Sequence, residues 1–130
     1  MKSANEITMT DQALLLKAKE IKEFAYAPYS LFHVGAAIRA EDGRVITGVN
    51  VENASYSLGI CAERAALSQA VSMGVRPGDI EAVAVTAPPC GGCRQWLLEF
   101  RVGRIIFESD GDIEVRSASE LLPWSFSLST

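Results

Sequence analysis

The sequence is poor in cysteine and histidine, with three cysteines and one histidine in 130 residues. An odd number of cysteines cannot all pair within one chain, which favours thiol or metal-ligand chemistry in a reducing compartment. No apolar run approaches the roughly 20 residues that cross a bilayer. The first ten residues also lack the basic and apolar regions of a signal peptide. We therefore expect a cytoplasmic protein with no membrane partner.

Basic clusters are missing as well. The chain has 12 Lys and Arg against 16 Asp and Glu, for a net charge of -4. Because nucleic-acid backbones are held by basic patches, this balance argues against a nucleic-acid partner and favours a small uncharged molecule. Linkers and repeats are absent, and 48% of the residues are hydrophobic. We expect one domain over residues 1–130 with a sizeable core.

Helical and strand patterns alternate along the chain. Apolar residues at helical spacing predict a first helix from an N-cap at Thr10 to Ala25. An Asp42-Gly43 turn between two apolar runs predicts a β-hairpin. The expected strands are 31–39, 44–50, 80–86, 104–108 and 113–116, and the later helices begin near residues 62, 91 and 119. This order predicts an α/β fold with three layers, in which helices cover both faces of a mixed sheet of about five strands.

All three cysteines lie where an expected helix begins. Cys61 precedes the helix that starts at residue 62, and Cys90 and Cys93 form a Cys-x-x-Cys motif at the start of the next one. That spacing lets two thiolates bind one zinc ion, and a helix N-terminus favours the thiolate form. Three thiolates leave one position of a tetrahedral zinc open, which is typical of a catalytic site rather than a structural one.

Two charged residues follow Cys61 closely enough to act at such a site. Zinc lowers the pKa of a bound water toward roughly 7. Glu63 would lie near that water and could take its proton and pass it on. Arg64 could donate hydrogen bonds to the ligand sulfurs and offset their surplus negative charge.

Simpler interpretations remain open for each residue taken alone. A Cys-x-x-Cys pair is more often a structural zinc knuckle or a redox pair. His33 could complete a closed site of three cysteines and one histidine. Glu63 could be a favourable acid in the first turn of a helix, and Arg64 a solvated helix residue.

The combination of motifs is more specific. Cys61-x-Glu63 with Pro-Cys90-x-x-Cys93 matches the three-cysteine form of the zinc deaminase signature. Within that superfamily the chain resembles the small, homotetrameric cytidine deaminases over roughly residues 12–126. The segments that carry this resemblance are 28–37, 47–56, 60–64, 93–95 and 121–123. It implies one zinc ion per subunit and sites shared between subunits.

The resemblance also implies how the pyrimidine base is held. Phe32 would line the base pocket, and the backbone at Ala62 would contact the base carbonyl. Phe126 of a neighbouring subunit would pack on the pyrimidine ring. The tail after Trp124 departs from the family pattern because it lacks the usual Gly-Pro and acidic ending, and His33 stands where proline is more common.

The same resemblance assigns the sugar to the segment after the second strand. Asn50 and Glu52 would bind the ribose hydroxyls, while Ala54 and Tyr56 would reach across a subunit boundary toward the 5′ end. Without the resemblance, Asn50 and Glu52 could equally be turn residues that bond the local backbone.

These observations predict zinc-dependent hydrolytic deamination of cytidine and 2′-deoxycytidine, which yields uridine and 2′-deoxyuridine, releases ammonia and serves pyrimidine salvage. One alternative is the same chemistry on a related aminopyrimidine such as blasticidin S, although Asn50 and Glu52 favour a substrate with a ribose. A second alternative, from another class, is a non-catalytic, zinc-stabilised module that binds a nucleoside or a partner protein.

Overall fold

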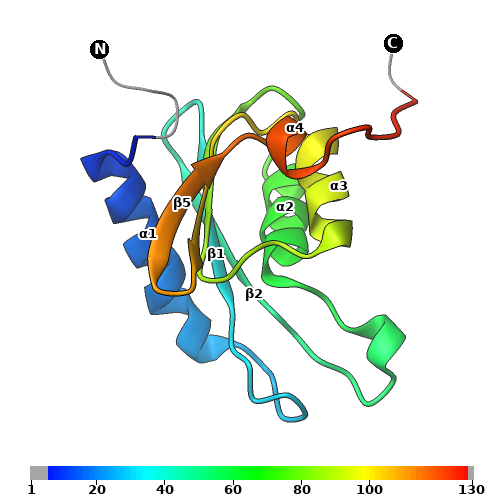
Figure 1. Ribbon diagram of the computed structural model, residues 1–130. Coiled ribbons are helices and arrows are strands. Elements are labelled where there is room, and N and C mark those ends of the chain that lie inside the picture. Colours follow the sequence, from blue (N-terminus) through cyan, green and yellow to red (C-terminus); the bar gives the residue numbers. More distant parts are fainter. Residues whose placement is uncertain (1–5, 129–130) are drawn as a thin grey trace.

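Five strands form one mixed sheet in the computed structural model, which describes residues 6–128 (Figure 1). Along the sheet the order is β2 (Val45–Val49), β1 (Gly35–Ala40), β3 (Ile80–Val85), β4 (Ile105–Ser109) and β5 (Asp112–Arg116). The pair β3 and β4 is parallel, and the other neighbours are antiparallel. The expected mixed sheet of five strands is confirmed, and the apolar strand β3 occupies its centre.

Helices cover both faces of this sheet, as the alternation of patterns predicted. Helix α1 (Met9–Ile21) and the 3-10 turn η1 (Lys22–Phe24) lie on one face, and α2 (Ala62–Ser72) and α3 (Gly91–Glu99) lie on the other (Figure 1). The short α4 (Ala118–Leu121) packs beside α3, and the 3-10 turn η2 (Tyr56–Leu58) belongs to a projecting loop.

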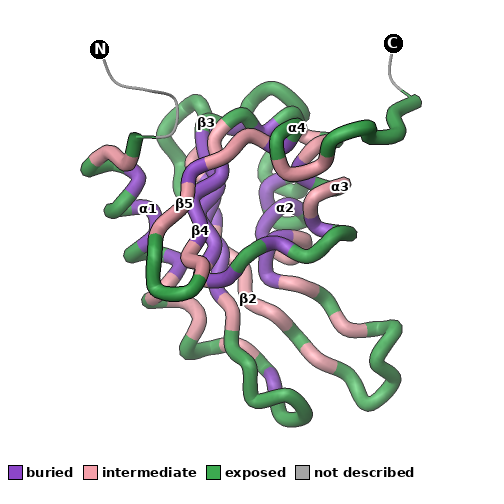
Figure 2. Tube along the Cα trace, viewed as in Figure 1, coloured by how far each residue is buried: buried purple, intermediate pink, exposed green. Residues whose placement is uncertain are grey.

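The core has two halves because side chains alternate along each strand. In β1, Ala37 faces α1, whereas Ala36 and Ile38 face α2 and α3. In β4, Ile106 joins the first half and Ile105 the second. Figure 2 shows the buried strands between the helices and the exposed loops that project from one end of the sheet.

Gly48 brings β2 unusually close to α2. A Cβ atom at this position would lie 2.7 Å from the carbonyl oxygen of Ala62 and closer still to the amide nitrogen of Ala66. Only a residue without a side chain permits this approach. The start of α2 is thereby fixed against the end of β2, which leads directly into Asn50.

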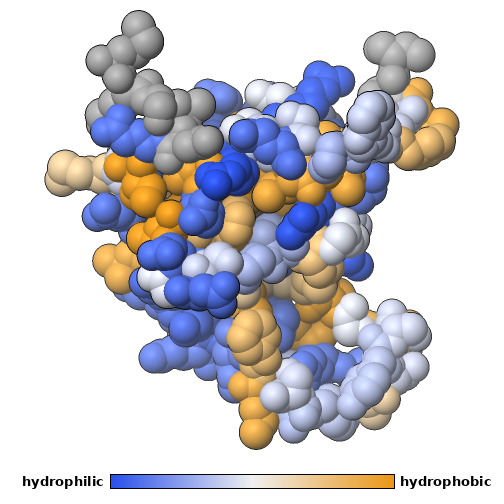
Figure 3. All heavy atoms as spheres, viewed as in Figure 1, coloured by the Kyte–Doolittle hydropathy of each residue, from blue (hydrophilic) through white to orange (hydrophobic). Residues whose placement is uncertain are grey.

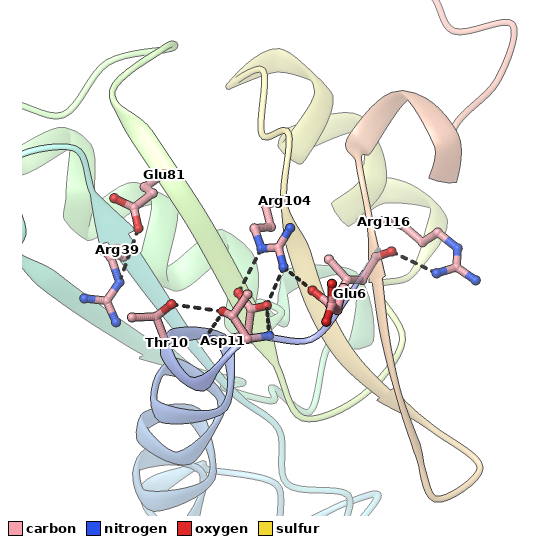
Figure 4. A network of polar contacts seen from close by, with 9 residues as sticks. Glu6, Thr10, Asp11, Arg39, Glu81, Arg104 and Arg116 are labelled. Carbon is pink, nitrogen blue, oxygen red and sulfur yellow. Dashed lines mark hydrogen bonds and ion pairs between the residues drawn. The ribbon is translucent and has the colours of Figure 1, made fainter. Parts of the chain in front are cut away.

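The first helix starts two residues earlier than expected. Thr8, not Thr10, is the N-cap, because the Thr8 hydroxyl accepts from the Asp11 amide at 3.1 Å and the Asp11 carboxylate accepts from the Thr8 amide at 2.8 Å. This reciprocal pair is a capping box. Arg104 also donates to Asp11 at 2.9 Å and to the Glu6 carbonyl at 2.6 Å, which ties the start of α1 to the residue before β4 (Figure 4).

The prediction for the first hairpin strand was wrong at its start. The strand begins at Gly35 rather than at residue 31, because Leu31 has φ 62° and cannot continue a strand. Residues 31–34 form a loop instead. Among the described residues, no helix is both long enough and apolar enough to span a membrane.

Candidate active site

The three cysteine sulfurs converge at the starts of two helices. Cys61 is the N-cap of α2, Cys90 is the N-cap of α3, and Cys93 lies buried in the first turn of α3. Their Sγ atoms lie within 4.8 Å of one another, and those of Cys61 and Cys90 are 3.9 Å apart. Neither N-cap thiol bonds the backbone of its own helix. Three soft donors therefore face one point.

This donor set fits zinc. Thiolates at two helix N-termini suit a tetrahedral zinc with one position left for water. Within residues 6–128, the three cysteines are the only group of three or more His, Cys, Asp or Glu side chains close enough to hold a metal ion. His33 is exposed and does not belong to that group. The closed site with a histidine as fourth ligand is therefore not formed.

The thiols influence one another strongly. The hydrogen bond with Cys93 lowers the pKa of Cys61 to about 6, and the bond with Cys90 and the charge of Arg64 act in the same direction. The same contact raises the pKa of Cys93, as does its burial. The sulfurs are therefore close enough for the charge state of one to depend on that of its neighbours.

Glu63 is buried beside the sulfurs, with 4% of its surface exposed. Burial raises the pKa of Glu63 to about 7, and the charge of Cys61 adds to that shift. A carboxyl group with a pKa near neutrality can both accept and donate a proton at physiological pH. This burial distinguishes Glu63 from an ordinary solvated acid in the first turn of a helix.

Arg64, in the first turn of α2, contacts one of the cysteine sulfurs. Its guanidinium donates to Cys90 Sγ at 3.8 Å. Gly92 leaves room for this contact, because a Cβ atom at position 92 would collide with the guanidinium. The positive charge therefore lies close enough to Cys90 to offset negative charge on its sulfur.

A cavity of about 330 Å³ opens over the cysteines and Glu63. That volume lies at the lower end of the range for pockets that hold small molecules. The residues predicted from the sequence that line it are Phe32, Asn50, Glu52, Tyr56, Cys61, Glu63, Cys90 and Cys93. The lining also includes Val34, Ile60, Ala87 and Pro88, which motif reasoning missed because apolar residues beside a motif carry no chemical signal.

The remaining predicted residues do not line this cavity. Ala62 is buried in the first turn of α2, Ala54 is exposed in the loop before η2, and Phe126 lies in the C-terminal segment. The Phe126 side chain is 70% exposed, and only its carbonyl is fixed, by Gln95 at 3.1 Å. Exposed apolar side chains of this segment stand out at the upper right of Figure 3.

Comparison with known proteins identifies the family. The sequence model described as the cytidine and deoxycytidylate deaminase zinc-binding region matches residues 8–109. The chain belongs to the cytidine and deoxycytidylate deaminase family. The match spans the described structure from the N-cap of α1 to the end of β4.

Individual members of the family are similar over almost the whole chain. The cytidine deaminase of Sporosarcina psychrophila is 44% identical, over 92% of this chain and 93% of its own length. That of Halalkalibacterium halodurans is 46% identical, over 91% and 95%. A crystal structure of cytidine deaminase from Burkholderia pseudomallei has a TM-score of 0.84 and 47% identity, and covers 91% of this chain and all of that one.

Asn50 and Glu52 are both held by the loop before β1. Asn50 Oδ1 accepts from the Val34 amide at 2.8 Å, and Asn50 Nδ2 donates to the Phe32 carbonyl at 2.9 Å. Glu52 accepts from the Tyr29 and Ser30 amides at 3.0 and 3.1 Å. Both side chains therefore bond the local backbone and also line the cavity.

Proposed function

We propose that this chain catalyses hydrolytic deamination of cytidine and 2′-deoxycytidine to uridine and 2′-deoxyuridine with release of ammonia. The observation that carries the proposal is the position of Glu63, buried beside three convergent cysteines at the wall of a cavity of nucleoside scale. The similarity to cytidine deaminases over nine-tenths of the chain supports it.

The cavity also favours a nucleoside over a nucleotide. Among the described residues, those that line the cavity include no Lys or Arg, and the carboxyl groups in the lining are those of Glu52 and Glu63. A substrate phosphate would find no basic side chain of this chain in the lining and would meet the Glu52 carboxylate. An uncharged nucleoside avoids that repulsion.

Cys61, Cys90 and Cys93 would hold the zinc ion, which when bound lowers the pKa of a water molecule so that it can attack C4 of the base. Glu63, buried beside the sulfurs, would accept the water proton and deliver it to N3. The same carboxylate would then take the proton of the hydroxyl now on C4 and pass it to the amino group, so that the C4–N bond breaks and ammonia leaves. Arg64 offsets charge at Cys90 during these steps.

Substrate recognition divides along the cavity. Phe32 lines the side where the base would lie, and Asn50 and Glu52 present polar atoms to the ribose hydroxyls. The same proposal places the backbone of Ala62 at the base carbonyl, and Ala54 and Tyr56 toward the 5′ end of the sugar. It also includes a homotetrameric assembly, one catalytic domain over residues 1–130 and a cytoplasmic location.

The first test is Glu63→Gln. The amide keeps the size of the side chain but cannot accept the water proton, so we expect turnover to fall by at least about 100-fold while zinc is retained. The measurement is the ultraviolet absorbance change of cytidine, together with the zinc content of each protein. Glu20→Gln, on the exposed side of α1, is the matched control and should keep full activity.

A zinc-loaded wild-type protein that leaves both cytidine and 2′-deoxycytidine unchanged would refute the proposal. Equal turnover by wild type and Glu63→Gln would refute the role of Glu63.

A further inference from the structure

Ser30 connects the two parts of the cavity wall. Its hydroxyl donates to Glu52 Oε2 and accepts from the Phe32 amide at 3.0 Å. Because an ionised carboxylate can only accept and the Phe32 N–H can only donate, the Ser30 hydroxyl proton is directed at Glu52. Ser30 belongs neither to the group of three cysteines nor to the lining of the cavity over the cysteines and Glu63, and no catalytic motif includes it.

The hydrogen bonds on Glu52 leave little of its carboxylate free. A carboxylate offers about four acceptor positions, two on each oxygen. The Tyr29 and Ser30 amides both bind Oε1, and the Ser30 hydroxyl binds Oε2. One acceptor position on Oε2 therefore remains. The Ser30 hydroxyl, ahead of the two amides, also holds the pKa of Glu52 below its ordinary value, which keeps the side chain in its accepting form.

We propose that Ser30 is a positioning residue that orients Glu52 so that Oε2 alone is open to a hydroxyl of the substrate sugar. The inference rests on the proposed function, because it concerns the ribose-binding end of the same cavity. It predicts that Ser30 affects the binding of the sugar and leaves the chemistry at Glu63 unchanged.

Loss of the hydroxyl should leave the base side of the cavity in place. The Phe32 carbonyl remains bound to Asn50 Nδ2, and the Val34 amide remains bound to Asn50 Oδ1. Glu52 keeps the two amide bonds to Oε1 but can then rotate Oε2 away from the sugar. The expected defect is therefore confined to substrates that carry hydroxyls at the 2′ or 3′ position of the sugar ring.

The test compares Ser30→Ala on cytidine and on 2′,3′-dideoxycytidine, which lacks both ring hydroxyls. We expect Ser30→Ala to raise KM for cytidine about tenfold with kcat within about twofold, and to change KM for the dideoxynucleoside less than about twofold. Ser30→Thr keeps the hydroxyl and should restore the cytidine KM. Ser72→Ala is the matched control, because its exposed hydroxyl bonds only the Ser68 carbonyl near the far end of α2.

A double-mutant cycle adds a second measurement. In a Glu52→Gln background, Ser30→Ala should raise the cytidine KM less than about twofold further, because both changes remove the same interaction. The inference would be overturned by an unchanged cytidine KM in Ser30→Ala, by an equal rise in KM for both nucleosides, or by full additivity with Glu52→Gln. Each of these outcomes would leave the deaminase activity established. Failure of the wild type to act on cytidine would instead overturn the proposed function and this inference with it.

Discussion

The Nε atom of Arg64 is buried and has no hydrogen-bond partner. In the described part of the chain it is the only buried side-chain nitrogen of this kind. An unpaired buried donor costs about 1–3 kcal/mol, so a compensating interaction must keep the guanidinium in place. The compensation is charge, because the same guanidinium donates to Cys90 and its pKa is raised by its contacts with the cysteines despite its burial. Arg64 is therefore bound to the site by the negative sulfurs whose charge it offsets.

Arg64→Ala should lower kcat about 10- to 100-fold, the usual effect of losing a residue that supports metal ligands. The physical reason is that uncompensated thiolates weaken the zinc ion as a Lewis acid. Steady-state kinetics on cytidine, with zinc content measured in parallel, test this. Arg76→Ala is the control, since Arg76 bonds backbone carbonyls at the far end of α2. An unchanged kcat in Arg64→Ala would show that the charge is compensated elsewhere.

At the scale of elements, Asp11 joins α1 to the sheet and gives the stability a pH dependence. Burial acts to raise the pKa of Asp11, but the hydrogen bonds from Arg104 and Thr8 outweigh it, so the pKa lies below its ordinary value. A carboxyl with a lowered folded-state pKa contributes stability above its unfolded pKa near 4. That contribution is lost as the pH falls through the folded-state value.

Asp11→Asn should therefore lower the free energy of unfolding by about 2 kcal/mol near pH 7, and by progressively less as the pH falls below about 4. Urea unfolding at several pH values measures the difference between wild type and variant. Glu114→Gln removes a more exposed partner of Arg116 and should have a much smaller effect. A difference that stays constant down to about pH 2 would contradict the assignment to Asp11 ionisation.

Gly48 links the packing of one element to the chemistry of another. Gly48→Ala places a methyl group against the backbone of α2 at Ala62 and Ala66, so we expect a loss of about 1–3 kcal/mol in stability. Because Cys61 and Glu63 lie at the start of α2, kcat should fall as well. Gly103→Ala is the control, since its added Cβ would have no heavy atom within 4 Å. Thermal melting and cytidine turnover of both variants measure the two effects, and full activity in Gly48→Ala would show that α2 moves without disturbing the site.

At the scale of the whole molecule, the sequence predicted the architecture better than its boundaries. The apolar run at 80–86 indicated a central strand, and β3 is central because its two faces pack under helices. The start of β1 could not be predicted, since nothing local to Leu31 signals its positive φ. The N-cap at Thr8 likewise depends on its pairing with Asp11 rather than on the type of residue.

The same division holds for the site. Motif spacing singled out the cysteines, Glu63 and Arg64, because these residues lie at or beside helix starts that the sequence marks clearly. The contact of Ser30 with Glu52 joins positions 22 residues apart in sequence and depends on how one loop lies against another. Long-range contacts of this kind arise from tertiary packing, which local patterns do not encode.

The position of Phe126 bears on the assembly of the subunits. Its side chain is exposed and does not line the cavity of its own chain, while Trp124 and Leu128 in the same segment are exposed as well. Exposed apolar side chains that are close in sequence typically mark an interaction surface. We therefore propose that Phe126 stacks on the pyrimidine in the site of another subunit, as the family resemblance implies.

Shared sites predict complementation between two defective variants. Phe126→Ala should lower kcat/KM for cytidine about 10-fold or more, because base stacking on an aromatic ring contributes about 1–3 kcal/mol. When Phe126→Ala and Glu63→Gln are co-expressed in equal amounts, about a quarter of the sites in a randomly mixed oligomer combine an intact Glu63 with an intact Phe126 from a neighbour. The purified mixture should then exceed the mean activity of the two separate variants at low cytidine concentration. Activity equal to that mean, or sedimentation of the wild type as a single 14.0 kDa chain, would show that each site is built from one chain alone.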